Sequence, residues 1–452
     1  MTSIVILAFN KLEYTKLCIE SIRTYTRLNS YEIIVVDNNS TDGTREWLLG
    51  QEDIIAILND DNVGFPAGCN QGMKVASGSE ILLLNNDIIV TKNWLELLLE
   101  SLYSDDNIGA VGPVTNNSSY YQAIPVAYRT IDEMQEFARS HNHSDSSQWE
   151  YRLKLIGFCF LVKKEVVDKV GALDEVFTPG NFEDDDYSFR ILEAGFQLIL
   201  NRNVFIHHFG SISWKDGNNE FANLLSNNKQ KFYNKWGFDA WSSTIIHYEL
   251  IEQMKFDGHH GKVNVLQVGC GCGGTLLQIK NKYQSANLYG IEPNSYAAKM
   301  ASQYANIEVN KLDLLPDYQT NYFDYIILGN VIEKMVDPWT YLQKLSSYLA
   351  DSGVIIANMV NVMHFSVIKN LIQGRWMYGE MGILDKNNLR HFTLFEIDRL
   401  FRDAGYSSIS YSAVNANASI EDEEWINYIS KISGLPNNDQ FKIGQYIIKA
   451  SK

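Results

Sequence analysis

Residues 81 to 90 read Ile81-Leu82-Leu83-Leu84-Asn85-Asn86-Asp87-Ile88-Ile89-Val90, an apolar run interrupted by three polar residues. Such a run predicts a buried β-strand, whose polar end brings two amides and a carboxylate to one edge of an α/β sheet. Hard oxygen ligands of this kind suit Mg²⁺ or Mn²⁺, and the ion could hold a diphosphate during a displacement reaction. A polar turn that merely closes a core strand explains the same three residues equally well.

The composition indicates a two-domain protein that acts on a small ligand. A chain of 452 residues with 45% hydrophobic content can form at least two cores, because single cores stop growing at about 250 to 300 residues. The formal charge of -16, without a Lys/Arg block, argues against nucleic acid or an anionic membrane as the main partner. No apolar run is long enough to span a bilayer and no signal peptide precedes the first strand. We therefore expect a soluble, cytoplasmic protein.

Strands and helices alternate through the first part of the chain. Apolar runs predict strands at residues 4–8, 32–37, 54–58 and 81–84. Helices are predicted between them at 14–25, 44–49 and 67–76. This order predicts a mostly parallel sheet covered by helices. Further on we expect a strand at 157–162, a helix at 187–194, a strand at 204–206 and a helix at 218–236.

Two other stretches define the organisation of the chain. Residues 116–150 are polar and indicate an excursion over an active site rather than core. A second strand and helix series has predicted strands at 263–268, 288–291, 325–328 and 354–358, and a C-terminal antiparallel pair at 407–412 and 444–450. The predicted domains are residues 1–240 and 262–452, joined by a linker at 241–261. The sequence does not specify an oligomeric state.

Two turn segments in the first half point to a nucleotide sugar. Asp37 ends the second strand before a polar turn at 38–43, and small residues in the segment 62–72 let backbone approach a ligand. In this order, together with residues 85–87, the chain resembles a rhamnosyltransferase-like family 2 glycosyltransferase of the GT-A fold over residues 2–240. The resemblance implies inverting transfer from a nucleoside diphosphate sugar to a glycan or to a lipid-linked or protein-linked saccharide. The donor contacts it implies are Ala8, Asn10, Asp37, Asn39, Asn62, Gly64, Asn70, Asn85 and Asn86.

An acidic cluster at residues 183–186 follows the motif Gly171-Ala172-Leu173-Asp174-Glu175. It resembles the acceptor-side signature of the same family, and the resemblance implies that Asp184 is the general base. The crowding of carboxyl groups should raise at least one pKa in the cluster. The alternative is an acidic helix start, where carboxylates favour the helix dipole.

Two adjacent histidines complete the resemblance in the first half. By resemblance, a histidine in the block that contains His207 and His208 joins the metal or the diphosphate, and the spacing favours His208. A neutral imidazole is a suitable metal ligand beside Asp87. The family often has a second carboxylate where this chain has Asn85, so the Mg²⁺ or Mn²⁺ ion should be held mainly by the diphosphate of the donor.

The second half contains a glycine turn at residues 269–274, followed by Glu292 at the end of the next predicted strand. The turn fits both a dinucleotide fingerprint and an S-adenosylmethionine fingerprint, so alone it cannot choose between them. The second half resembles class I methyltransferases over about residues 262–452. The resemblance rests on residue 313 and on the segments 323–333, 337–338, 382–393 and 404–406. It implies a Rossmann-like domain that binds S-adenosylmethionine through Gly269, Gly271, Gly273, Glu292, Asp313 and Asn330.

The resemblance leaves the role of the second half open between two hypotheses. In the first, the domain methylates the same glycan that the first half builds, and His391 deprotonates an acceptor hydroxyl. In the second, the domain is a non-catalytic module for cofactor binding or assembly, and His391 is a packed histidine at a helix start. Methyl transfer can proceed by proximity and alignment, so the first hypothesis does not depend on a base.

Overall fold

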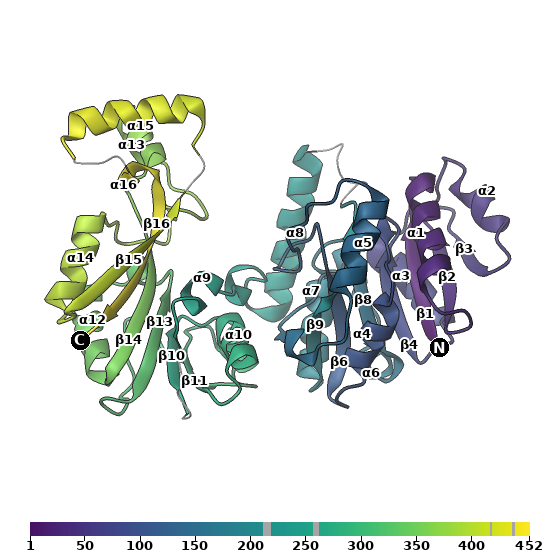
Figure 1. Cartoon of the computed structure of the whole chain (residues 1–452), viewed down its shortest axis with the longest axis horizontal. Helices are drawn as coiled ribbons and strands as arrows, with labels where there is room; N and C mark the ends of the chain where they lie inside the picture. Colours follow the sequence, from purple (N-terminus) through teal and green to yellow (C-terminus); the bar gives the residue numbers. More distant parts are fainter. Residues whose placement is uncertain (211–217, 256–261, 416–417, 436–438) are drawn as a thin grey trace. The chain divides into compact units, whose positions relative to one another are not determined.

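The computed structural model describes residues 1–210, 218–255, 262–415, 418–435 and 439–452 (Figure 1). The chain separates into two compact units, Met1–Ala240 and Trp241–Lys452. Each unit has a mixed sheet with its own hydrophobic core.

The first unit begins with the parallel strands that the sequence predicts. These are β1 (Thr2–Ala8), β2 (Tyr31–Asp37), β3 (Ile54–Leu58) and β4 (Glu80–Asn85), in the spatial order β3-β2-β1-β4. Ala8 pairs with Asp37 and Leu7 pairs with Asn85, so the carboxyl ends of β1, β2 and β4 meet at one edge of the sheet. The connecting helices are α1 (Leu12–Tyr25), α2 (Thr44–Leu49) and α3 (Phe65–Val75).

The sheet continues beyond β4 as a mixed sheet rather than a parallel one. Its further strands are β8 (Cys159–Lys163), β6 (Ile108–Thr115), β9 (Gln197–His208) and β5 (Ile88–Ile89). β8 runs antiparallel to both β4 and β6, and β5 runs antiparallel to β9. The helices of this half are α4 (Trp94–Leu102), α6 (Lys164–Val170), α7 (Glu183–Glu193) and α8 (Asn218–Trp236), with a turn of 3-10 helix, η2 (Glu175–Phe177).

The prediction that residues 116–150 avoid the core is wrong for part of that stretch. It contains α5 (Ile131–His141), η1 (Ser146–Gln148) and the start of β7 (Trp149–Arg152), which pairs with β9. Met134 and Ala138 on α5 are fully or nearly fully buried. The Thr130 side chain caps α5 by accepting a hydrogen bond from the Glu133 N–H, which stabilises the helix start. A few apolar residues in an otherwise polar stretch therefore build a helix that packs on the sheet.

α7 begins four residues before the predicted start at residue 187. Its first turn consists of the four acidic residues at 183–186. Carboxylates in the first turn of a helix interact favourably with the unpaired N–H groups and the helix dipole. The acidic cluster is thus part of a helix, which fixes the directions of its side chains relative to one another.

The second unit has the predicted parallel sheet with an antiparallel edge. Its spatial order is β12 (Asn306–Glu308), β11 (Asn287–Ile291), β10 (Asn264–Val268), β13 (Phe323–Gly329), β14 (Leu349–Val360), β16 (Ile443–Ser451) and β15 (Ser408–Asn415). β16 runs antiparallel to both β14 and β15. The helices and 3-10 turns that follow the strands are α10 (Gly274–Lys282), α11 (Ser295–Ala301), η5 (Ile332–Lys334), α12 (Pro338–Tyr348), α13 (Phe365–Ile372), α14 (Leu394–Asp403), α15 (Ile420–Ser433) and α16 (Asp439–Lys442).

The predicted linker at 241–261 is instead built into the second unit over its described part. It contains η4 (Ser242–Thr244) and α9 (Tyr248–Ile251), whose Leu250 and Ile251 are buried. Their apolar side chains need a core, and the second unit provides it. Residues 256–261 of the predicted linker lie outside the described residues.

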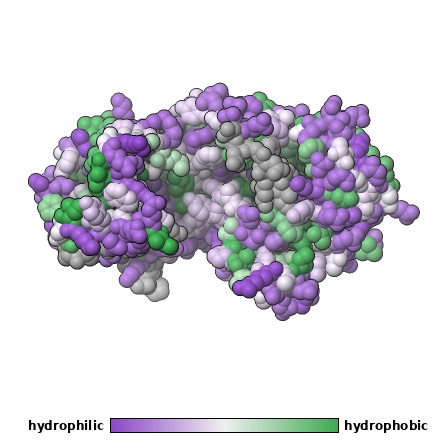
Figure 2. Space-filling model, turned by 90° about the horizontal axis from the view of Figure 1, so that it is seen from above, coloured by the Kyte–Doolittle hydropathy of each residue, from purple (hydrophilic) through white to green (hydrophobic). Residues whose placement is uncertain are grey.

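The surface agrees with the acidic, polar composition of the chain. Figure 2 shows a face on which hydrophilic residues predominate and hydrophobic residues are scattered among them. Within the described ranges, no helix combines the length and the apolarity that a bilayer span requires.

Candidate functional sites

Asp37 lies fully buried at the carboxyl end of β2 in the first unit. Its Oδ2 accepts a hydrogen bond from the Ser40 N–H at 3.1 Å and lies 3.3 Å from the Arg45 guanidinium. Its Oδ1 is buried and has no hydrogen-bond partner among the described residues. A buried acceptor without a partner is costly, so Oδ1 fits a ligand that supplies an N–H or O–H group.

The loops after β1 and β2 are joined by backbone and side-chain hydrogen bonds. The Ala8 carbonyl accepts from the Asn38 N–H at 2.8 Å, and the Asn10 side-chain carbonyl accepts from the Thr41 N–H at 2.8 Å. Asn10 and Asn39 adopt left-handed backbone conformations, with φ of 55° and 66°. Three of the predicted donor contacts therefore shape one rigid edge around Asp37.

The segment 62–72 forms a second rigid wall. The Asn62 Oδ1 accepts from the Gly64 N–H at 3.0 Å, and a Cβ on Gly64 would lie 2.8 Å from Thr178 Cγ2. The Asn70 amide bonds both the N–H and the carbonyl of Leu173 at 2.9 Å. The side chains of Asn62 and Asn70 thus have protein partners, and they hold neighbouring loops in place.

Asp87 and His208 lie face to face at this same end of the sheet. The Asp87 Oδ1 is 3.3 Å from the His208 Nε2. The His208 Nδ1–H donates to the Asn117 carbonyl at 2.7 Å, which leaves a lone pair on Nε2 in the neutral ring. Nε2 is buried and has no hydrogen-bond partner in the described part of the chain. Two acceptors that face each other fit a cation between them.

The candidate metal site has few protein ligands. Across the described ranges, no group of three His, Cys, Asp or Glu side chains is placed to hold a metal ion. The Asn86 side chain donates to the Thr15 hydroxyl at 3.0 Å, and the Asn85 carbonyl lies 3.7 Å from the Cys18 thiol. An ion at Asp87 and His208 would consequently need oxygen ligands from a bound molecule.

The neighbouring loop fixes the position of His208. β5 pairs with β9 so that Ile88 lies opposite His208, and this register brings Asp87 beside the imidazole. The Asn116 amide accepts from the His208 N–H at 2.8 Å and donates to the His208 carbonyl at 3.1 Å. Asn116 and Asn117 are not among the residues predicted for the site, although an Asn pair directly after a strand is a recognisable signal in the sequence.

His207 has a different environment from His208. Its Nδ1 lies 2.6 Å from the Tyr128 hydroxyl, and its ring packs edge-on against Phe209 at 4.6 Å. Burial and the neighbouring His208 lower the pKa of His207 to about 4. A neutral His207 thus packs against aromatic side chains, and His208 is the histidine that lies against Asp87.

Three of the four carboxyl groups in the acidic cluster are buried, and two of them are ion-paired. Asp185 lies 2.8 Å from the Lys154 ammonium, and Asp186 accepts from the Arg190 guanidinium at 2.9 Å. Burial, followed by the neighbouring carboxylates, raises the pKa of Glu183 well above its usual range. These three acids therefore support the fold or stay neutral.

Asp184 differs from its neighbours because it is partly exposed and because, in the described part of the chain, its carboxylate bonds only to backbone groups. Its Oδ2 accepts from the Gly157 N–H at 2.8 Å and its Oδ1 from the Asp185 N–H at 2.9 Å. Burial first, and then the charge of Asp185, raises the pKa of Asp184 to about 6. The expected pKa rise within the cluster is confirmed, although burial contributes more than crowding.

A chain of contacts links Asp184 to the Asp87–His208 pair. The carbonyl of Phe158, the residue after Gly157, accepts from the Asn85 N–H at 3.0 Å. The Phe158 ring stacks on the His208 ring with centroids 5.4 Å apart. The segment 157–158, directly before β8, therefore contacts both the carboxyl of Asp184 and the end of β4.

In the second unit, Glu292 follows the carboxyl end of β11 and is buried. Its Oε2 accepts from the Gly271 N–H at 2.7 Å and its Oε1 from the Asn294 N–H at 2.9 Å. Burial raises the pKa of Glu292, and the two backbone hydrogen bonds oppose that rise. Each carboxylate oxygen can accept a further hydrogen bond, which suits the two hydroxyl groups of a ribose.

The three predicted glycines all adopt positive φ, at 70°, 56° and 82° for Gly269, Gly271 and Gly273. A Cβ on Gly269 would lie 2.6 Å from Val331, and one on Gly273 would lie 2.6 Å from the Tyr304 hydroxyl. A Cβ on Gly271 would lie 2.5 Å from the Ser243 carbonyl oxygen. Close packing within the protein therefore already accounts for each of these glycines.

The remaining residues predicted for the second site lie in different loops: Asn330 directly follows β13, Asp313 lies in the loop after β12, and His391 precedes α14. The Asp313 Oδ1 accepts from the Val336 N–H at 3.1 Å, and the Asn330 N–H donates to the Asn358 Oδ1 at 2.6 Å. His391 is half-buried, and burial lowers its pKa. The Nδ1 of His391 has no hydrogen-bond partner within the described residues, so the neutral ring can accept a proton.

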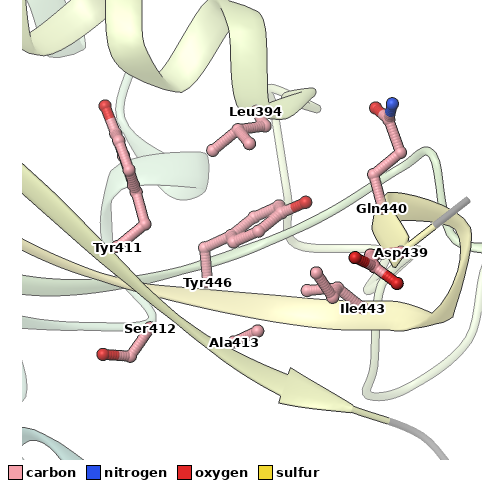
Figure 3. A pocket seen from close by; sticks show the side chains of 8 residues that line it. All are labelled: Leu394, Tyr411, Ser412, Ala413, Asp439, Gln440, Ile443 and Tyr446. Atoms are coloured by element: carbon pink, nitrogen blue, oxygen red, sulfur yellow. The ribbon is translucent and has the colours of Figure 1, made fainter. Parts of the chain in front are cut away.

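A pocket of about 300 Å³ opens beside β15 and β16. Figure 3 shows Tyr411 and Tyr446 on one face of this strand pair, with Leu394 of α14 above Tyr446. The Tyr446 hydroxyl is buried and lacks a hydrogen-bond partner among the described residues. No residue that the sequence predicts for a site lines this pocket, so we assign it no role.

Two family models match the chain, one in each half. Glycosyl transferase family 2 matches residues 3–171, and the methyltransferase domain family matches residues 217–411. The first match contains the predicted donor and metal residues up to Asp87. The second contains the glycine turn, Glu292 and His391.

Two curated proteins are similar to slightly less than half of the chain. The uncharacterised protein y4gI of Sinorhizobium fredii is 25% identical over 230 residues, which are 47% of this chain and 25% of that protein. Glycosyltransferase GlyG of Streptococcus pneumoniae is 26% identical over 219 residues, which are 46% of this chain and 68% of that protein. The match thus spans a quarter of the first curated relative and about two thirds of the second.

A solved methyltransferase structure is also similar to part of the chain. It is an S-adenosylmethionine-dependent enzyme of Thermotoga maritima, described as a possible histamine N-methyltransferase. The likeness has a TM-score of 0.32 at 16% identity and covers 50% of this chain and 96% of that one. The family models carry the assignment: this chain combines a glycosyl transferase family 2 domain with a methyltransferase domain.

Proposed function

We propose that the first unit is an inverting glycosyltransferase that moves a sugar from a nucleoside diphosphate donor to a hydroxyl of a glycan or of a lipid-linked or protein-linked saccharide. In this proposal, the unpartnered Asp37 Oδ1 accepts a hydrogen bond from the nucleoside. The loop walls at residues 8–10, 38–41 and 62–64 orient the donor along the sheet edge, because their own polar groups are held by hydrogen bonds.

Asp184 acts as the general base. The acceptor oxygen forms a bond to the anomeric carbon while the bond from that carbon to the diphosphate oxygen breaks, and the hydroxyl proton passes to the Asp184 carboxylate. Attack from the face opposite the leaving group inverts the anomeric centre. The pKa of about 6 leaves Asp184 ionised at neutral pH and still basic enough to take the proton.

Asp87 and His208 would hold a divalent ion, Mg²⁺ or Mn²⁺. When bound, such an ion supplies positive charge against the diphosphate as it leaves. The observation that carries the proposal is the pair of facing acceptors, Asp87 Oδ1 and His208 Nε2, which lie 3.3 Å apart. Phe158 stacks on His208, and the preceding Gly157 N–H donates to Asp184. Asp184 is the partly exposed acid of the cluster.

A donor screen tests this proposal. Nucleoside diphosphate sugars with different bases would be incubated with the full chain and Mn²⁺, and release of the nucleoside diphosphate would be measured. We expect one donor to be hydrolysed slowly, with loss of that activity in the Asp184→Asn variant. Equal hydrolysis by the variant and the unaltered chain would contradict the assignment of the base.

For the second unit, we propose S-adenosylmethionine as the cofactor and a hydroxyl of the same glycan as the methyl acceptor. Glu292 would bind the ribose hydroxyls, Gly269, Gly271 and Gly273 would lie under the methionine and ribose, and His391 would take the acceptor proton. Asp313 and Asn330 would border the adenine and the sulfonium side. The buried Glu292 carboxylate, with one backbone donor on each oxygen, is the observation that favours this ligand.

The alternative function of the second unit is cofactor binding or assembly without catalysis. Isothermal titration with S-adenosylmethionine distinguishes a unit that binds the cofactor from one that serves assembly alone. Heat of binding together with a rise in the unfolding temperature supports a cofactor site. No heat and no thermal protection would leave the second unit as an assembly module.

A further inference from the structure

The segment 241–251 lies along the carboxyl edge of the second unit's sheet. The Ser243 carbonyl accepts from the Cys272 N–H at 2.6 Å, and its backbone fills the space where a Cβ of Gly271 would be. Further along, the His247 N–H donates to the hydroxyl of Thr275, in the first turn of α10, at 3.0 Å. This segment therefore begins on the glycine turn and continues beyond it.

His247 reaches the end of the neighbouring strand, β13. A Cβ on Gly329 would lie 2.5 Å from the His247 Nε2 and 2.6 Å from its Cδ2, so only glycine at this position leaves room for the imidazole. The side chain of His247 is 8% exposed. The imidazole is thus packed into the sheet edge against Gly329, the residue before Asn330.

Glu249 holds the imidazole in place. Its Oε1 lies 2.9 Å from the His247 Nδ1 and accepts from the Asn358 Nδ2 at 3.3 Å. The Oδ1 of Asn358 in turn accepts from the Asn330 N–H. The Glu249 side chain is 36% exposed, so a bound molecule can reach its carboxylate.

The strand order gives this pair a definite place relative to Glu292. The sheet runs β11-β10-β13, with Glu292 after β11, the glycine turn after β10 and Gly329 at the end of β13. Ligands of open α/β sheets lie across the carboxyl ends of such strands. A cofactor whose ribose binds Glu292 and whose chain crosses the glycine turn brings its other end to His247 and Glu249.

We propose that His247 and Glu249 bind the amino-acid end of S-adenosylmethionine. The pair matches the chemistry of that end. With its Nδ1–H donating to Glu249, the protonated ring of His247 offers its Nε2–H to the α-carboxylate, and the Glu249 carboxylate accepts from the α-ammonium group. The inference rests on the proposed cofactor of the second unit. It adds to the cofactor site two residues that the sequence analysis assigned to a linker.

Titration with two ligands tests the inference. S-adenosylmethionine carries the amino-acid end, whereas methylthioadenosine retains the adenine, ribose and sulfur but lacks it. We expect His247→Asn and Glu249→Gln in the full chain to weaken S-adenosylmethionine about 10-fold to 100-fold, as expected for lost hydrogen bonds to charged groups. Methylthioadenosine should bind both variants as it binds the unaltered chain, which also serves as the control for folding.

A matched control is His364→Asn, because His364 is a buried histidine of the same unit whose Nδ1 lies 2.8 Å from the Ser366 hydroxyl. It should not change the affinity for either ligand. Unchanged S-adenosylmethionine affinity in the His247 and Glu249 variants would overturn this inference. An equal loss of affinity for S-adenosylmethionine and methylthioadenosine would also overturn it. Neither result would contradict the proposed cofactor. Failure of the unaltered chain to bind S-adenosylmethionine would overturn the proposed cofactor and, with it, this inference.

Discussion

The sheet edges of the two units differ in what their polar atoms contact. In the first unit, the Asp37 Oδ1 and the His208 Nε2 are buried acceptors without a hydrogen-bond partner among the described residues. In the second unit, the backbone N–H groups of residues 269–273 all donate to protein oxygens. In the proposed function, these acceptors of the first edge would bind a cation and ligand donors. The second edge would bind its proposed ligand mainly through side chains, two of which come from the segment before β10.

The largest expected effect comes from removing the proposed general base of the first site. Asp184→Asn should lower the rate of sugar transfer or donor hydrolysis by about 10² to 10⁴-fold, since an amide cannot take the acceptor proton. Asp186→Asn in the same helical turn should instead lower the unfolding temperature, because it leaves Arg190 and Lys235 without their buried partner. Rates per folded molecule and thermal unfolding, measured for both variants, would distinguish these roles. A slow Asp186→Asn and a normal Asp184→Asn would reverse our assignment.

The next effect concerns the facing acceptors. Asp87→Asn, or chelation of divalent ions, should lower the rate by about 100-fold, on the order of losing one group that stabilises developing charge. Addition of Mn²⁺ after chelation should restore the unaltered chain but not the variant. Asp53→Asn, which removes an exposed partner of Arg23, is the matched control and should have no effect. Full activity in the presence of chelator would contradict the proposed role of a divalent ion.

The third effect tests how closely the segment 241–251 is packed on the glycine turn. Gly271→Ala places a Cβ 2.5 Å from the Ser243 carbonyl, so we expect a loss of about 1 to 3 kcal/mol in unfolding free energy from overpacking, beyond the cost of positive φ. Gly374→Ala shares the positive φ but has no atom within 4 Å of its Cβ, and it isolates the second cost. Denaturant unfolding of both variants measures the difference. Equal losses of unfolding free energy in the two variants would mean that the segment 241–251 moves away from the added Cβ without an energetic penalty.

The smallest effect is a shift in pH dependence. The proposed base, Asp184, would act as a carboxylate, so we expect the rate to fall as the pH drops through its pKa of about 6. Asp185→Asn removes a charge that raises the pKa of Asp184 and leaves the Lys154 ammonium, which lowers it. The acidic limb of the profile should therefore move about one unit lower. An acidic limb that does not move, measured at saturating donor, would show that another group controls it.

Much of the first site could be predicted because strand periodicity fixes the strand ends. Asp37 and Asn85 end apolar runs, and parallel pairing brings such ends to one edge. The choice among the four acids at 183–186 could be made only by resemblance, since their difference depends on distant partners. Lys154 and Arg190 neutralise two of them, and the position of Lys154 beside Asp185 follows from tertiary packing alone.

The second site was predictable only in its glycine turn and in Glu292. The segment 241–251 was missed because its elements, η4 and α9, are only three and four residues long. Such short elements show no helical period, so their sequence reads as a linker. The position of His247 on Gly329 depends on a glycine 82 residues later in the chain, and no local pattern connects the two.

One titration experiment tests most directly that the chain holds two ligand sites of different construction. The full chain would be titrated with UDP, GDP and dTDP in the presence of Mn²⁺ and, separately, with S-adenosylmethionine. Our account predicts that one nucleoside diphosphate and S-adenosylmethionine each bind with one site per chain, and that saturation with one leaves the stoichiometry of the other unchanged. Displacement of one ligand by the other, or no binding of any nucleoside diphosphate, would contradict it.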